Sequence, residues 1–328
     1  METRLDWLSR LLSLVPVSGR LDHRCFLSAP WRIEYQPAPP GEIPFHIVLG
    51  GAVSFEETKG PAAPGRPRQL RPGDIVVVMH GAAHALHDGS GAAPLPQRNR
   101  AALNNLIITE NDGTGERIDM LCGSFRVSPV HEKMLRRYLP PRLVISAPEN
   151  SAATARQGTG AELATLVALM RTESVSENLG SAAMLDALST ALFALILRHA
   201  SEASVAAEGL LALAGNPKLA PALTAMFNEP AHPWTLPELA SLCNMSRATF
   251  IRHFQEGLGR SAMDLLTEIR MTVAANALAS TETSTGAVAE LAGYQSDAAF
   301  QRSFKQFMGV TPAQWRKQAL AKNNAAAG

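Results

Sequence analysis

Residues 236–255, LPELASLCNMSRATFIRHFQ, return in altered form as residues 285–307, TGAVAELAGYQSDAAFQRSFKQF. In both copies apolar residues recur at steps of three and four, which predicts two short helices joined by a turn. Ser246 and Ser296 are the expected N-caps of the second helices. Each copy therefore predicts a helix-turn-helix. The expected buried face of the first helix consists of Leu239, Ala240, Leu242 and Cys243 in one copy and of Val288, Ala289, Leu291 and Ala292 in the other.

The second helix of each copy carries polar and cationic residues on the side away from its apolar stripe. A helix-turn-helix leaves this outer face free to enter a major groove, so promoter DNA is the expected partner. Arg252 and Arg302 occupy the same place in the repeat, where a guanidinium can contact guanine or a phosphate. The candidate DNA-binding residues are Ser246, Arg247, Thr249, Arg252 and His253 in the first copy and Ser296, Asp297, Gln301, Arg302 and Lys305 in the second. The expected core consists of Phe250, Phe254, Phe300, Phe304 and Phe307.

The segment between the copies predicts a single connecting helix over residues 261–279. At 1.5 Å per residue it is about 28 Å long, close to the ~34 Å between successive major grooves on one side of DNA. Residues 216–328 hold ten basic and eight acidic side chains, so their attraction to phosphates is modest. Two subunits bound together would compensate, which favours a homodimer.

This C-terminal segment resembles the AraC/XylS-type DNA-binding domain. The resemblance rests on the doubled helix-turn-helix, on EIRMTVAANAL (268–278) in the connecting helix, and on AELAGYQSDAAFQRSFKQFMGVTPAQWRK (289–317). Thr311-Pro312 opens a last helix in the family's manner, whereas Ser261-Ala262 departs from its usual proline. The resemblance implies a transcription regulator that binds promoter DNA and RNA polymerase through residues 216–320.

Length and composition indicate a globular chain of about two domains. The chain has 328 residues, of which 46% are hydrophobic and 18% charged, and its formal net charge of +1 favours neither a nucleic-acid nor a membrane partner overall. Three cysteines do not make a disulfide framework and fit a reduced, cytoplasmic protein. The N-terminus lacks a signal-peptide pattern. Residues 182–197, the most apolar segment, are shorter than the ~20 residues of a membrane span, so no membrane partner is expected.

Short apolar runs separated by Pro and Gly predict a β-rich domain in the first 145 residues, either a small barrel or a jelly roll. Gly50-Gly51 between two such runs predicts a hairpin, and residues 71–74 predict a turn. Further strands are expected at 102–109 and 117–127. Two helices are then predicted at 162–174 and 182–200, and the small, Ala-rich residues 201–215 are interpreted as a linker.

The β-rich part resembles the cupin-type sensor domain of one AraC-type subgroup. The matching segments are GRLDHRCFLSAPW (19–31), PFHIVLGG (44–51), RPGDIVVVMHGAAHAL (71–86), MLCGSFRV (120–127) and LRRYLPPRLVIS (135–146). Within that subgroup the chain is similar to regulators that respond to reactive chlorine and related oxidants, whose paired cysteines align with Cys25 and Cys122. Positive charge from His23 and Arg24 is expected to favour the Cys25 thiolate, the form that oxidants attack. Cys243 is predicted to be core.

The histidines of the β-rich part raise a second possibility. His46, His80, His84 and His87 suggest a cupin-type metal centre, but the usual His-x-His pair and its carboxylate are missing, so no metal is predicted. His46 and His84 stay as secondary candidates for a soft metal. Neither a catalytic constellation nor a phosphate loop is found, so no enzyme activity and no cofactor are expected. The alternatives are a regulator that senses an organic ligand or a soft metal, and a cupin metalloenzyme fused to a DNA-binding tail.

The sequence as a whole predicts an α+β fold. A cupin-like β-barrel is expected over residues 1–147, a helical hairpin that forms the dimer over 160–200, a linker over 201–215, and an all-α double helix-turn-helix domain over 216–320. The predicted function is a dimeric cytoplasmic transcription regulator, an activator, that senses oxidants through Cys25 together with Cys122.

Overall fold

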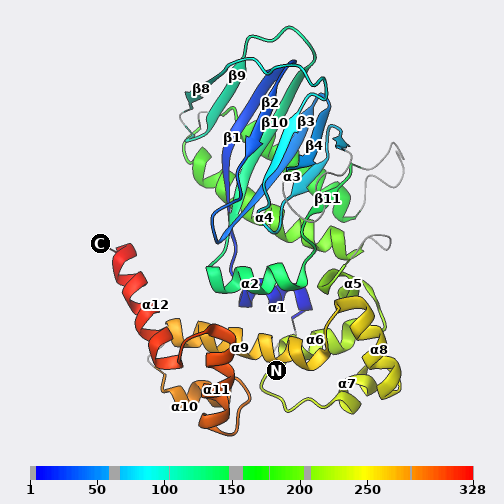
Figure 1. The fold of residues 1–328 in the computed structure, drawn as a ribbon, viewed down its shortest axis with the longest axis vertical. Coiled ribbons are helices and arrows are strands. Elements are labelled where there is room, and N and C mark those ends of the chain that lie inside the picture. Colours follow the sequence, from blue (N-terminus) through cyan, green and yellow to red (C-terminus); the bar gives the residue numbers. More distant parts are fainter. Residues whose placement is uncertain are drawn as a thin grey trace. The chain divides into compact units, whose positions relative to one another are not determined.

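The computed structural model describes residues 5–58, 67–102, 104–147, 158–176, 178–202, 208–280 and 283–327 (Figure 1). The chain divides into two compact units, Val17–Ala203 and the combination of Met1–Pro16 with Ser204–Gly328. We call them the sheet unit and the helical unit. The first sixteen residues thus group with the helical unit, whereas the sequence analysis placed them in the β-rich domain.

The sheet unit contains two sheets. One has seven strands in the order β11-β6-β3-β10-β1-β9-β8, and the other has four in the order β2-β7-β4-β5. The strands are β1 (Ser18–Ser28), β2 (Arg32–Tyr35), β3 (Glu42–Gly50), β4 (Val53–Glu57), β5 (Arg68–Leu70), β6 (Ile75–Val77), β7 (His84–His87), β8 (Gln97–Ala101), β9 (Ile107–Asn111), β10 (Arg117–Arg126) and β11 (Leu143–Ile145). This α+β architecture, with a sheet-rich first domain and helical last domain, confirms the predicted fold class.

Two strand predictions are corrected. Gly50-Gly51 does not close a hairpin, because β3 pairs with β10 and β6 whereas β4 pairs with β5 and β7. The chain instead crosses from one sheet to the other there, and Gly51 takes a positive φ of 74° that suits glycine. Residues 102–109 are not one strand, since β8 ends at Ala101 and β9 begins at Ile107. The turn at 71–74 and the strand at 117–127 are found as predicted.

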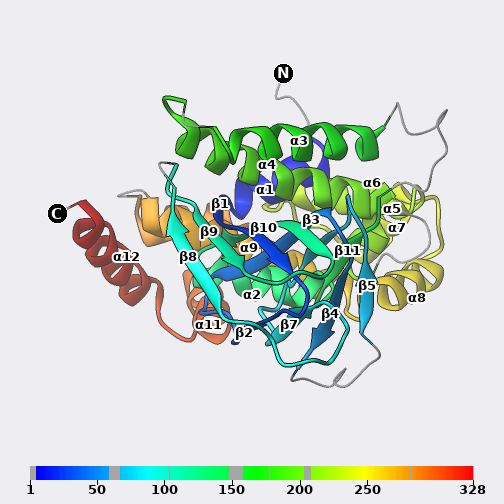
Figure 2. The same ribbon diagram turned by 90° about the horizontal axis from the view of Figure 1, so that it is seen from above.

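Three helices belong to the sheet unit: α2 (Pro129–Tyr138), α3 (Thr159–Glu173) and α4 (Ser181–Glu202). Figure 2 shows α3 and α4 running together along one side of the seven-stranded sheet. At Gly19 on β1, a Cβ would lie 2.3 Å from the backbone carbon of Ser189, so α4 can approach this closely only because residue 19 is glycine. The helix has 22 residues and is long and apolar enough to cross a membrane by length and composition alone, a test that a buried core helix also passes. It buries Leu185, Leu188 and Leu192 within the unit.

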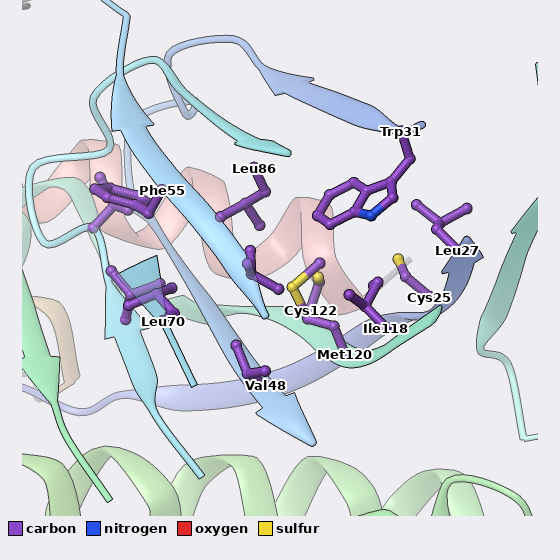
Figure 3. Packing of buried hydrophobic residues seen from close by; sticks show 13 residues of the cluster. Cys25, Leu27, Trp31, Val48, Phe55, Leu70, Leu86, Ile118, Met120 and Cys122 are labelled. Atoms are coloured by element: carbon purple, nitrogen blue, oxygen red, sulfur yellow. The ribbon is translucent and has the colours of Figure 1, made fainter. Parts of the chain in front are cut away.

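The core between the two sheets is an apolar cluster that includes both cysteines of interest (Figure 3). Cys25, Ile118, Met120 and Cys122 belong to it. The remaining members are Leu27, Trp31, Val48, Val53, Phe55, Leu70, Val76, Val78 and Leu86.

The helical unit contains the two predicted helix-turn-helices, formed by α7 with α8 and by α10 with α11, and joined by α9. Its helices are α1 (Trp7–Leu14), α5 (Leu210–Gly215), α6 (Ala220–Asn228), α7 (Leu236–Leu242), α8 (Arg247–Leu258), α9 (Ala262–Ser280), α10 (Thr285–Leu291), α11 (Asp297–Met308) and α12 (Pro312–Ala327). Because α5 occupies residues 210–215 and buries three leucines, the predicted linker ends earlier than expected.

The predicted first-helix faces are correct except at one repeated position. Leu242 and its counterpart Leu291 are 41% and 52% exposed, although the other members of both faces are buried. Each is the last residue of a seven-residue helix. The two copies therefore leave the same leucine position outside the core.

Candidate functional site

Cys25 and Cys122 are brought onto one face of the sheet by neighbouring strands. Cys25 on β1 pairs with Met120 on β10, and Cys122 follows two residues later on the same face. The two cysteines are 2% and 3% exposed, and both are free thiols. The structure thus places the two candidate sensing residues diagonally across one strand pair, inside the apolar cluster.

A tyrosine and two histidines surround Cys122. The Tyr35 hydroxyl donates to Cys122 Sγ at 3.6 Å, and the Tyr35 ring stacks on His84 with 4.7 Å between ring centres. His46 lies directly opposite Cys122 on β3. Its Nε2 lies 2.8 Å from His84 Nε2. His46 and His84 are candidates from the sequence, whereas no local signal marks Tyr35, because the pairing of β2 with β7 joins residues far apart in the chain.

The hydrogen bonds assign a proton to each histidine. His84 Nδ1 lies 2.8 Å from the Ala82 carbonyl, so it carries the hydrogen, and His84 Nε2 must accept from His46 Nε2. His46 Nδ1 is then unprotonated, and it is buried with no partner among the described residues. Burial lowers the pKa of both histidines below the usual range, well below for His46. The pair is therefore neutral at physiological pH.

Cys122 and Tyr35 are both protonated at neutral pH, because the pKa of each is raised. The Cys25 thiol and burial raise the pKa of Cys122 well above its usual range. Burial also raises the pKa of Tyr35, with the neighbouring Cys122 and Cys25 adding to the effect. Cys122 is therefore a thiol rather than a thiolate at neutral pH.

The predicted cationic surroundings of Cys25 are wrong. Arg24 projects to the opposite face of β1, where its guanidinium lies 4.7 Å above the Phe26 ring. It binds Asp119 with its Nε at 3.0 Å and its Nη2 at 2.8 Å. On the thiol side, His23 lies opposite Cys122, and burial lowers the pKa of His23, so this imidazole is neutral too. Alternation along the strand separates residues that are adjacent in sequence.

Arg24 also reaches the end of α3. Its Nη1 donates to the Arg171 carbonyl at 3.1 Å and to Ser174 Oγ at 2.7 Å. The guanidinium thus satisfies the C-terminal end of α3, where a cation interacts favourably with the helix dipole. Sequence reasoning missed this role, because nothing local marks the contact between residues 24 and 171.

The metal candidates form a pair rather than a ligand set. In the described part of the chain, no three His, Cys, Asp or Glu side chains are arranged as a group that could hold a metal ion. His80 and His87 are only partly buried and contribute nothing to the His46–His84 pair. What the site offers is a buried dithiol beside a chain of neutral hydrogen-bonding groups.

The second helices of the two repeats present the other candidate site. Ser246 and Ser296 cap α8 and α11 by accepting from the backbone amides of Thr249 and Ala299 at 3.2 and 3.4 Å. Phe250, Phe254, Phe300 and Phe304 are buried as predicted, whereas Phe307 is partly exposed. The exposed candidates are Ser246, Arg247, Arg252, Ser296, Asp297, Gln301, Arg302 and Lys305.

Two of the predicted DNA-contact residues are less accessible to a DNA partner than the others. Thr249 is partly buried, and its Oγ1 lies 2.9 Å from Ser246 Oγ. His253 Nδ1 lies 3.4 Å from a carboxylate oxygen of Glu256. Sequence reasoning also missed an exposed apolar residue of α8, Ile251, which stands beside the Phe250–Phe254 stripe.

Comparison with known proteins agrees with this two-part organisation. A cupin family model matches residues 6–202, and a helix-turn-helix domain model matches residues 239–318. An uncharacterised HTH-type transcriptional regulator of Haemophilus influenzae is 29% identical over 95% of this chain and 99% of its own. The RCS-specific HTH-type transcriptional activator RclR of Escherichia coli is 26% identical over 96% of this chain and 98% of its own.

Among solved structures, the DNA-binding domain of AdpA in complex with a target DNA is 26% identical, with a TM-score of 0.31. The match covers 33% of this chain and 96% of that domain. The cupin match extends over more than half of the 328 residues, and the full-length relatives are HTH-type regulators. The chain belongs to the cupin family and is a DNA-binding transcription regulator that joins a cupin domain to an AraC-type helix-turn-helix domain.

Proposed function

We propose that this regulator is an oxidant-responsive activator whose signal is a disulfide between Cys25 and Cys122. The observation that carries the proposal is the diagonal placement of two free, buried thiols on paired strands. The name of the E. coli relative, an RCS-specific activator, points to the same class of signal.

The chemistry consumes one oxidant molecule for each disulfide. Hypochlorous acid oxidises the Cys25 thiol to a sulfenic acid and leaves as chloride and a proton. The Cys122 sulfur then attacks the Cys25 sulfur, and the hydroxyl of the sulfenic acid leaves as water with the Cys122 proton. Two thiols lose two electrons, and hypochlorous acid is reduced to chloride. Cys122 fits the second role because its raised pKa keeps it a thiol until its partner is oxidised.

Burial of the site favours a neutral oxidant. Hypochlorous acid is small and uncharged, so it enters an apolar cluster at low cost, whereas an anion loses its hydration there. The neutral His23, His46 and His84 give no cation that would attract an anionic oxidant. The expected preference is for neutral oxidants.

Disulfide formation is expected to move β1. Diagonal neighbours in an antiparallel pair are typically about 7–8 Å apart, whereas a disulfide holds its Cα atoms within about 6.8 Å. Closing the bond draws β1 along β10, and the register shift between Leu21 and His23 is a place that can absorb the movement. The moving strand carries Gly19 against α4 and Arg24 against the end of α3.

The output is expected at the hairpin and at promoter DNA. Residues 17–147 act as the sensor, and α3 and α4 form the homodimer through apolar side chains such as Leu169 and Met184, which are 47% and 49% exposed. The exposed faces of α8 and α11 bind promoter DNA, and the bound regulator recruits RNA polymerase. In the cytoplasm, reduced thiols would be the resting state.

A transcription reporter with matched serine variants tests this proposal. Cys25→Ser and Cys122→Ser are expected to lose the response to hypochlorous acid, while Cys243→Ser, which removes a buried thiol of α7's C-terminal end, keeps it. A full response in both Cys25→Ser and Cys122→Ser would contradict the thiol signal.

One observation favours a second candidate, a soft metal held by His46 and His84. Their Nε2 atoms face each other at 2.8 Å, and the Ala82 carbonyl orients His84 as in many metal ligands. Purified protein with stoichiometric copper or zinc that is lost in His84→Gln would support it. Protein that purifies without metal and still responds to oxidant would contradict it.

A further inference from the structure

Helix α8 exposes one large apolar side chain in the middle of its outer face. Ile251 is 40% exposed, although the neighbouring Phe250 is fully buried. Arg247 and Gln255 lie one turn before and after it, and both are exposed. Ile251 therefore stands in the centre of the surface that the helix presents outward.

The corresponding position of the second repeat carries a different chemistry. Phe250 corresponds to Phe300 and Arg252 to Arg302, so Ile251 corresponds to Gln301 on α11, which is also exposed. The arginine that follows is the same in both helices. At this position, α8 therefore carries an apolar side chain and α11 carries an amide.

The major groove offers a partner for each of these groups. Thymine is the base whose edge presents a methyl group there, whereas adenine presents the N6 and N7 pair that glutamine binds. A branched aliphatic side chain has no hydrogen bond to offer, so the thymine methyl group is its matching surface. Ile251 is far more exposed than the buried Phe250 beside it, and isoleucine is a weaker helix former than glutamine.

We propose that Ile251 is a specificity-determining residue that contacts a thymine methyl group in the half-site read by α8. This inference rests on the proposed role of α8 in reading DNA and goes beyond it by naming the base. The half-site read by α11 lacks this requirement, because Gln301 stands in the same place. The two half-sites of one subunit are therefore unlike.

The experiment begins by selecting a binding site from random duplex DNA with the full-length protein. Each thymine of the selected site is then replaced by deoxyuridine, which keeps the base pair and removes only the methyl group. We expect one position at which this replacement weakens binding about fourfold, the value of one buried methyl-sized group. In Ile251→Ala, the same replacement is expected to have no effect.

Leu242→Ala is the matched control, because Leu242 is 41% exposed in the same repeat but lies on α7. This variant should keep the fourfold thymine preference. Thermal unfolding of both variants checks that the helical unit remains folded.

Two results would overturn the inference. One is a thymine preference that persists in Ile251→Ala, and the other is the absence of any methyl-sensitive position within a well-bound site. If Ile251→Ala lowers transcription while the affinity for every DNA stays unchanged, Ile251 contacts a protein instead. Failure of the proposed reading role is distinguishable, because Arg252→Ala would then leave DNA affinity unchanged as well.

Discussion

At the scale of single residues, the proposed thiol site depends on groups that are neutral and buried. Tyr35 joins the thiol pair to the histidine pair, since its hydroxyl donates to Cys122 while its ring stacks on His84. The Tyr35 hydrogen bond also lowers the pKa of Cys122, against the larger opposing effects of Cys25 and burial. Tyr35 is thus expected to tune the attacking thiol.

Tyr35→Phe removes this hydrogen bond with little change in packing. We expect disulfide formation to slow about fivefold, the equivalent of about 1 kcal/mol for one hydrogen bond, because the Cys122 thiolate becomes harder to form. Alkylation of free thiols at timed intervals after oxidant addition measures the rate. Tyr294→Phe in the helical unit is the control, and an equal rate in both variants would exclude a role for the Tyr35 hydroxyl.

The buried histidines predict how stability depends on pH. Because burial lowers the pKa of His46 and His84 below 6.5 in the folded protein, the unfolded chain binds more protons in acid. The stability that these neutral histidines contribute to the folded protein is fully present above pH 6.5 and is lost as the pH falls below it. His46→Gln should flatten this loss by up to about 1.4 kcal/mol per pH unit.

Urea unfolding between pH 7.5 and 5 tests this expectation. His253→Gln, a substitution on the surface of α8, serves as the control. A pH dependence of His46→Gln identical to that of the wild-type protein would show that His46 is not held neutral.

At the scale of elements, β1 connects the thiols to the helical hairpin. Arg24 is 4% exposed and makes two hydrogen bonds to Asp119 and two to the end of α3. Lysine cannot reproduce this planar set of donors. Arg24 is thus the contact by which a displaced β1 would reach α3.

Arg24→Met leaves Asp119 without its partner and α3 without a cation at its C-terminus. The sheet unit should lose about 3 kcal/mol of stability, since removal of one partner of a buried pair is strongly destabilising. Arg117→Met, which removes an exposed guanidinium from the same Phe26 ring, should cost less than about 1 kcal/mol. Urea unfolding gives both values, and similar losses would contradict the role of Arg24.

The sequence predicted the elements whose signals are local and missed those that depend on distant pairing. The helix-turn-helix repeat, the strand at 117–127 and the two hairpin helices follow from local patterns in the sequence. The hairpin predicted at Gly50-Gly51 is wrong, because a glycine pair marks a turn but not which sheet the next strand joins. Arg24 was placed beside Cys25, and Tyr35 was missed, for the same reason: the contacts join strands that are far apart in sequence.

At the scale of the whole molecule, the thiol pair and the helix-turn-helices lie in separate compact units. The first sixteen residues group with the helical unit, and β1 begins two residues later at Ser18. The exposed apolar side chains of the hairpin, Leu169 and Met184, predict that a second copy covers them.

Charge placed on the hairpin should separate the subunits. Leu169→Glu combined with Met184→Glu is expected to raise the dimer dissociation constant at least about tenfold, because the carboxylates would lose hydration in the interface. Analytical ultracentrifugation measures it, with Leu320→Glu on α12 as an equally exposed control. An unchanged sedimentation coefficient in the double variant would place the dimer contact elsewhere.

The central claim is that oxidation joins Cys25 to Cys122 and thereby changes the regulator's action on DNA. The most direct test is intact-mass analysis with peptide mapping, before and after one equivalent of hypochlorous acid, alongside binding and transcription from the selected promoter site. The account predicts the loss of two hydrogens, a crosslink between the peptides of Cys25 and Cys122, a free Cys243, and a change in DNA binding or transcription. Both thiols remaining free while transcription still responds would contradict it.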